Sequence, residues 1–332
     1  MGSHTDIAST ATTSSANPAA EWFLYSLGPF QFRSLIELPE LQHCPVPGRF
    51  PVTISFLPIP DTMPGAVRVD RWVTLSATEF LLSIPKAGRF YVANGQDVRV
   101  EPDPDVAPPD LRIYLLGSVF GALCHQNGML PLHASAIEHN GCFTAFLGES
   151  GAGKSTMAAC LQRRGYRIVC DDICLFEPAA DSGRMQVVPV AGWLKLWRTS
   201  LDHLGESPVE DHRVLSTDDK YRLYLGSQFG SQETAQPALA NLIFLARSQS
   251  PGEAPRMEPL TTVETMANMM AMVYMRYLVE ANGSRTHVFQ QCAQILSEGA
   301  RGFRLTVPWG FEQMDSVLDL LEEAILRPTG PR

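Results

Sequence analysis

The sequence predicts an α/β layered fold for residues 111–332, preceded by a smaller β-rich part. Three observations support this fold class. Strand-like and helix-like segments alternate through residues 111–332. A glycine-rich loop at residues 148–155 follows an apolar strand-like run and precedes a helix-forming run. Residues 21–105 contain short β-like runs that proline and glycine interrupt.

The first hundred residues suggest two segments and a boundary. Residues 1–20 are rich in Ser, Thr and Ala, and we expect a disordered lead-in. Residues 21–105 predict a β-rich N-terminal domain, in which Asn94-Gly95 is a hairpin signal. Residues 101–110 are acidic and proline-rich, which is typical of a linker. We therefore place a second domain at residues 111–332.

The second domain opens with a helix and a hairpin. Apolar residues at positions 111, 115, 119 and 123 predict a buried helix that ends near Gly128. Residues 130–139 and 142–147 read as strands joined by a turn at Asn140-Gly141. The later pattern predicts helices over 157–165, 261–278, 287–299 and 311–326, and strands over 166–170, 240–247 and 302–308.

Composition and charge exclude several classes of function. Apolar residues make up 45% of the chain and charged residues 18%, as in soluble globular proteins. The net charge of -9, without a long basic run, argues against nucleic-acid binding. No apolar run has the length of a membrane span or the form of a signal peptide. The seven cysteines form no C-x-x-C pair, so we expect reduced thiols and a cytoplasmic location.

The loop "GESGAGKS", Gly148 to Ser155, matches G-x-x-x-x-G-K-[ST] in full. Its glycines allow a tight turn, and its N–H groups and the following helix start favour an anion. Lys154 supplies a charge for terminal phosphates, and Ser155 offers a hydroxyl to Mg²⁺. We therefore predict ATP and Mg²⁺ as ligands. The predicted binding residues of the loop are Gly148, Ser150, Gly151, Ala152, Gly153, Lys154, Ser155 and Thr156.

The adjacent pair Asp171-Asp172 is singled out by its position. If strand 166–170 is parallel to strand 142–147, the pair lies at the sheet edge where the loop holds phosphate. One carboxylate can then hold the metal, and the other can take a proton from an attacking hydroxyl. Counting back across the turn, His139 faces Cys142 and His133 faces Gly148, so His133 would also stand beside the phosphates.

The polar stretch between residues 197 and 241 predicts a covering segment. It contains "DDKYRLYL", in which Lys220 and Arg222 could close over the transferred phosphate. The alternative is a solvated surface strand, and the sequence leaves both open.

Residues 132–176 carry a family resemblance. "LPLHASAIE" and "FLGESGAGKSTMAACLQRRGYRIVCDDI" resemble the core of the HPr kinase/phosphorylase family. The resemblance implies a P-loop kinase domain that is related to phosphoenolpyruvate carboxykinase. In this family, the domain phosphorylates a serine of a protein. The resemblance implies that Lys154 and Ser155 bind ATP and Mg²⁺, that Asp171 is the acid/base with His133 beside it, and that Asp172 is on the metal side. It also implies a homo-oligomer.

Two departures from that family point to a subgroup. Its E-x-R-G signature is not visible after the aspartates, where the chain reads "VVPVAGWLKLW", and residues 21–105 do not resemble its N-terminal domain. Segments such as "FQFRSLIELPEL" and "YLLGSVFGAL" look like the HPr-kinase-like enzymes of lasso peptide gene clusters. That resemblance implies a precursor peptide, phosphorylated on its C-terminal serine, as substrate.

Other functions fit the same residues. The chain could be a kinase of HPr or another carrier protein, acting in one direction or reversibly. It could instead be a nucleotide-binding regulatory module whose β-rich half binds a partner, or a simple ATP hydrolase.

Overall fold

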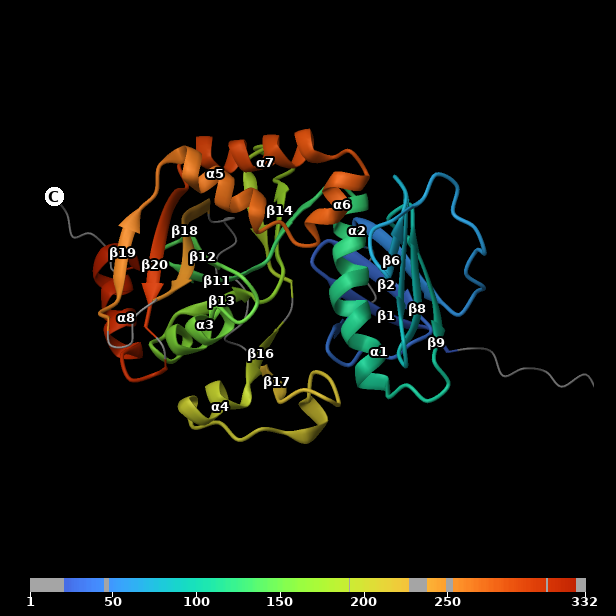
Figure 1. The fold of residues 1–332 in the computed structure, drawn as a ribbon, viewed down its shortest axis with the longest axis horizontal. Coiled ribbons are helices and arrows are strands. Elements are labelled where there is room, and N and C mark those ends of the chain that lie inside the picture. Colours follow the sequence, from blue (N-terminus) through green and yellow to red (C-terminus); the bar gives the residue numbers. More distant parts are fainter. Residues whose placement is uncertain are drawn as a thin grey trace, which may run out of the picture.

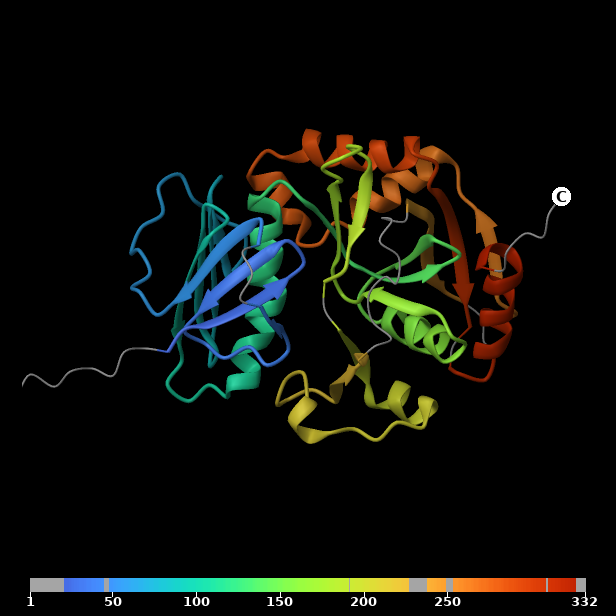
Figure 2. The ribbon, with the colours of Figure 1, turned by 180° about the vertical axis from the view of Figure 1, so that it is seen from behind.

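The computed structural model describes residues 21–44, 48–190, 192–226, 238–248, 253–308 and 310–326. The predicted lead-in, residues 1–20, lies outside the described residues. The fold is a mixed α/β arrangement, in which a long helix stands between an N-terminal sheet and the rest of the molecule (Figures 1 and 2). None of the described helices combines the length and apolar character needed to cross a membrane.

The N-terminal sheet is built from residues 23–102 in the order β3-β1-β2-β4-β9-β8-β7-β6-β5. Most neighbours are antiparallel, and Asn94 and Gly95, with φ of 53° and 67°, connect β8 to β9. These positive φ values are the ones that Asn and Gly adopt most readily. The strands are β1 (Phe23–Leu27), β2 (Phe30–Ser34), β3 (Gln42–His43), β4 (Phe50–Ser55), β5 (Val67–Arg68), β6 (Val73–Leu75), β7 (Glu79–Ile84), β8 (Gly88–Ala93) and β9 (Asp97–Pro102).

The long helix consists of α1 (Pro108–Tyr114), the π-helical turn η1 (Leu115–Val119) and α2 (Phe120–Gln126). The predicted helix is confirmed, but it begins at Pro108, because proline is tolerated in the first helical turn. Its buried residues, among them Leu111 and Phe120, pack into the core of the N-terminal sheet. The helix that we assigned to the second domain therefore packs on the first.

The central sheet has the order β13-β11-β12-β18-β20-β19. Strands β12, β18 and β20 are parallel, and β13 runs in the same direction because both β13 and β12 are antiparallel to β11. The predicted hairpin register is confirmed, with His139 opposite Cys142 and Ala134 opposite Leu147. The bounds are β11 (Ala134–His139), β12 (Cys142–Leu147), β13 (Arg167–Cys170), β18 (Ala238–Arg247), β19 (Arg256–Pro259) and β20 (Arg301–Val307).

Helices cover both faces of the central sheet. On one face lie α3 (Lys154–Arg163), α8 (Met314–Leu321) and η4 (Glu322–Leu326), and on the other lie α5 (Thr262–Ala271) and α7 (Arg285–Ser297) (Figure 1). The remaining elements are β10 (Leu130–Leu132), β14 (Cys174–Pro178), β15 (Met185–Val188), β16 (Trp193–Trp197), α4 (Arg198–Leu204), η2 (Glu210–His212), β17 (Lys220–Tyr224) and α6 (Arg276–Ala281). Strands β16 and β17 pair with each other beside α3.

The single helix predicted over residues 261–278 is wrong. Helix α5 ends at Ala271, and α6 begins after Met275, whose φ of 52° is left-handed. The intervening backbone pairs with the segment before β11: the Tyr274 N–H donates to the Pro131 carbonyl at 2.9 Å, and the His133 N–H donates to the Met272 carbonyl at 2.8 Å. These tertiary hydrogen bonds override the helical preference of the Met-rich stretch. They also fix the backbone of His133.

Candidate active site

A cavity of about 350 Å³ lies at the edge of the central sheet where β12, β13, β18 and β20 end. Ligands of open α/β sheets bind at this edge, because the loops that follow the strands converge there. Residues after or at the ends of these strands line the cavity: Ser150 to Thr156, Asp172, Arg247, Val307 and Phe311. We call it the loop cavity.

The glycine-rich loop joins β12 to α3. Gly151 and Gly153 have φ of 81° and 98°, which side chains rarely tolerate, and α3 begins directly at Lys154. A Cβ atom added to either glycine would meet nothing within 4 Å. The backbone conformation, and not crowding, therefore requires glycine here, and the space above the loop is open to an anion at the helix start.

Lys154 is 6% exposed and folds back on its own loop. Its Nζ donates to the carbonyl of Gly148 at 2.7 Å and to that of Glu149 at 2.9 Å. Burial lowers the pKa of Lys154 to about 8, although Asp172 and Asp171 oppose the change. The ammonium group is thus charged at neutral pH, and a phosphate would offset its lost hydration.

Asp172 faces the loop cavity and forms an ion pair that the sequence did not predict. Its Oδ2 accepts a hydrogen bond from Lys195 Nζ at 2.7 Å. Burial alone would raise the pKa of Asp172, but Lys195 and then His133 outweigh it and hold that pKa well below its usual range. Lys195 lies on β16 between the buried Leu194 and Leu196, so the alternation in "WLKLW" was the signal that could have found it.

His133 lies beside Asp172. Its Nδ1 is 3.0 Å from the Asp172 carbonyl oxygen and 3.4 Å from Oδ1 of the same residue. Because a carbonyl only accepts, Nδ1 carries the hydrogen, and Nε2 is left as the acceptor. Burial and the charge of Lys154 lower the pKa of His133, so the ring is mostly neutral at pH 7.

Asp171 does not line the loop cavity. Its Oδ1 accepts a hydrogen bond from Ser135 Oγ at 2.5 Å, and its Oδ2 accepts one from the Lys195 backbone N–H at 2.9 Å. It lines an adjoining cavity between β16 and the long helix. Asp172, the next residue, has a left-handed φ of 68°. Asp172 lines both cavities, whereas Asp171 lines only the adjoining one.

The two cations of β17 that were predicted to contact phosphate lie in different places. Lys220 lines the loop cavity, but Arg222 does not: it is buried, with Nη1 at 3.4 Å from Glu40 Oε1. Two residues along a strand span about 6.6 Å, which carries Arg222 past the cavity. Arg222 lines the adjoining cavity instead, and its contact with phosphate stays a prediction. Residues 227–237 of the predicted covering segment lie outside the described residues.

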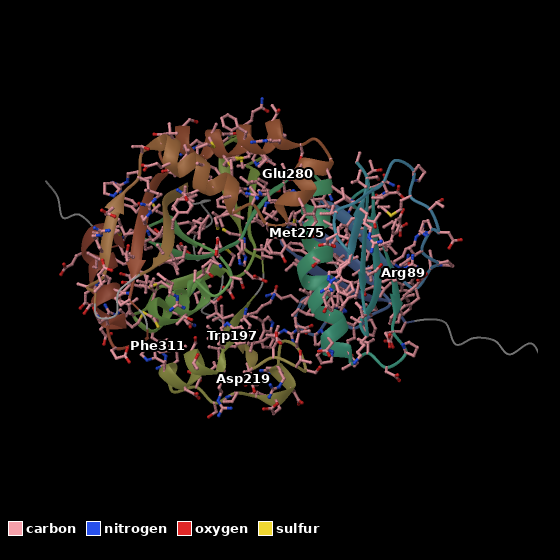
Figure 3. The ribbon with its side chains drawn as sticks, viewed as in Figure 1. Arg89, Trp197, Asp219, Met275, Glu280 and Phe311 are labelled. Atoms are coloured by element: carbon pink, nitrogen blue, oxygen red, sulfur yellow. The ribbon has the colours of Figure 1, made fainter. Side chains whose placement is uncertain are left out.

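Aromatic residues from distant segments complete the loop cavity. Trp197 from β16 and Phe311, which follows β20, both line it and lie on the side of the molecule where α3 and α4 stand (Figure 3). Phe311 stacks on His203, with ring centroids 4.3 Å apart. Nothing in the sequence around these residues marked them for a site, because only the fold brings them to the loop.

The residues present fit Mg²⁺ when it arrives with a nucleotide. Ser155 and Asp172 both line the loop cavity. Within the described segments, no three His, Cys, Asp or Glu side chains gather into a metal cluster. Mg²⁺ commonly takes one or two protein oxygens and completes its shell with phosphates and water. This donor set suits such an ion better than a metal held by protein alone.

Comparison with known proteins does not identify a family for this chain. No protein-family model matches the chain, and no curated protein matches it. Among solved structures, the HPr(Ser) kinase/phosphatase from Coxiella burnetii is similar over 58% of this chain and 88% of that chain, with 12% identity and a TM-score of 0.30. A similarity this low carries no argument about function.

Proposed function

We propose that the protein is an ATP- and Mg²⁺-dependent kinase that transfers the γ-phosphate to a serine hydroxyl of a peptide. The observation that carries this proposal is the position of the two aspartates. Asp172 lines both the loop cavity, which it shares with Lys154, and the adjoining cavity, which Asp171 lines. A phosphate donor in one cavity and a hydroxyl acceptor in the other could therefore meet at this pair.

The loop cavity is the nucleotide side. Its backbone N–H groups and Lys154 bind the phosphates, and Ser155 and Asp172 would hold Mg²⁺, which neutralises charge on the phosphates. Lys195 and Lys220 also line the cavity. Cations placed at the transferred group stabilise the charge that it carries in the transition state.

The adjoining cavity is the acceptor side. The serine Oγ attacks the γ-phosphorus in line, so that a new O–P bond forms, the bond to the β–γ bridging oxygen breaks, and ADP leaves. The hydroxyl proton passes to Asp171, which Ser135 and the Lys195 N–H hold in place. Asp172 is the poorer base, because Lys195 keeps its pKa low.

The sequence resemblance supports the C-terminal serine of a lasso peptide precursor as the acceptor. The test is the intact mass of such a peptide after incubation with enzyme, ATP and Mg²⁺. A gain of one phosphate group is expected, and it should be absent with the Lys154→Ala variant and with a peptide whose serine is replaced by alanine. An unchanged peptide mass while ATP stays bound would contradict the proposal and favour a regulatory nucleotide-binding module.

A further inference from the structure

The cavity beyond the aspartates has a volume of about 50 Å³ and lies between β16 and the long helix. It shares Asp172 and Lys195 with the loop cavity, so the two spaces adjoin at the proposed point of transfer. Its wall is apolar where Ile113, Leu116 and Phe120 of the long helix contribute. An occupant would touch Asp171 on one side and the N-terminal part of the chain on the other.

Glu40 also lines this cavity, and its carboxylate is paired with two arginines. Its side chain is 8% exposed, and its Oε1 is 2.9 Å from Arg112 Nε and 3.4 Å from Arg222 Nη1. Its Oε2 is buried and has no hydrogen-bond partner among the described residues. Glu40 is thus already paired with Arg112 and Arg222, so the apolar wall, and not this carboxylate, would select the occupant.

We propose that this cavity is the acceptor subsite, and that it binds a small aliphatic side chain next to the acceptor serine. The inference rests on the proposed kinase function and deepens it. The space holds several water molecules, which matches one aliphatic side chain and excludes an aromatic ring.

This subsite would also give the N-terminal sheet a function in peptide recognition. The sheet packs against the long helix, and the helix supplies the apolar wall through Ile113 and Leu116. Glu40 follows β2 of the same sheet and bonds to Arg112 of the helix. The N-terminal part therefore determines which peptides reach Asp171, while the central sheet holds the nucleotide.

The test is a set of peptides that share one frame and one serine. The residue on each side of the serine is varied among Gly, Ala, Val, Leu, Phe, Asp and Lys, and kcat/KM is measured with ATP and Mg²⁺. We expect Val or Leu at one position to be preferred about tenfold over Gly and over Phe, as for fit into a small apolar pocket. Ile113→Trp, which fills the cavity, should lower kcat/KM for the preferred peptides about ten- to a hundredfold.

A gain of specificity separates this role from a structural one. Ile113→Ala enlarges the cavity and should shift the preference toward Phe, a change that partial unfolding cannot produce. Val263→Trp, at a position 79% exposed on α5, is the matched control and should leave the peptide preference unchanged. Nucleotide binding and the melting temperature, measured for each variant, identify a misfolded protein, and in that case Ile113→Ala carries the test.

The outcomes separate the two proposals. Phosphorylation of peptides without an aliphatic preference, or an unchanged preference in both Ile113 variants, would overturn the acceptor subsite and leave the kinase. Wild-type protein that binds ATP but phosphorylates no peptide of the set would overturn both.

Discussion

Replacing Asp171 by Asn should remove phosphotransfer while the fold and nucleotide binding persist. The carboxylate accepts hydrogen bonds from Ser135 Oγ and from the Lys195 backbone N–H. In the variant, the amide oxygen can keep the bond to the N–H, and the amide nitrogen can donate to the serine hydroxyl, which rotates to accept. Two charge-assisted bonds become neutral ones, which costs about 2 kcal/mol of stability in total.

The catalytic loss should be far larger. Without a proton acceptor at this position, the transfer rate should fall about 10²–10⁴-fold, or about 3–5 kcal/mol in barrier. Ser135→Ala is the matched control: it removes one of the same two bonds but keeps the carboxylate, so it should lower stability comparably and the rate less than about tenfold. Single-turnover transfer, ATP affinity and thermal unfolding should be measured for both variants. A rate for Asp171→Asn equal to that of Ser135→Ala would refute the assignment of Asp171 as base.

Three further predictions concern the charges around the loop. Lys154→Ala should weaken ATP binding about ten- to a hundredfold, measured by calorimetry, because a charge-assisted phosphate contact is lost; unchanged affinity would remove Lys154 from the nucleotide site. In the wild type, ATP affinity should fall as the pH rises above about 8, toward the affinity of Lys154→Ala, since the pKa of Lys154 is lowered to about 8 and the neutral amine loses the charge-assisted contact. A flat profile to pH 10 would contradict this. Lys195→Met removes the ammonium group that lowers the pKa of Asp172 but keeps the backbone N–H that holds Asp171. The pKa of Asp172 should therefore rise, and the loss of kcat/KM in acid should begin at a higher pH. If the acid limb of the kcat/KM profile does not move, the Lys195–Asp172 ion pair does not set it.

Local patterns in the sequence were enough to predict the glycine-rich loop and the elements around it. The Asn140-Gly141 turn fixes the register of β11 and β12, and the strand–loop–helix pattern fixes the position of Lys154. The direction of β13, which brings Asp171 and Asp172 to the loop, followed from the same alternation of strands and helices. These features depend on residues within about one βαβ unit, where period and turn chemistry are decisive.

The rest of the site depends on contacts between distant segments. Lys195 and Phe311 come from segments whose approach to the loop no local pattern records. The break between α5 and α6 arises because residues 272–274 pair with residues 131–133, which propensity cannot reveal. The placement of Arg222 beside Glu40 depends on how β17 lies against the N-terminal part. The left-handed backbone of Asp172, with φ of 68°, is a conformation that the Asp-Asp pair does not predict.

The most direct test of the account follows the γ-phosphate itself. ATP labelled at the γ-position is incubated with Mg²⁺, enzyme and a serine-containing peptide, and the label is counted separately in peptide and in inorganic phosphate. A peptide serine kinase should place the label on the peptide serine, and this labelling should depend on both Lys154 and Asp171. Label that appears only as inorganic phosphate, at a rate that no peptide changes, would contradict the kinase and identify an ATP hydrolase instead.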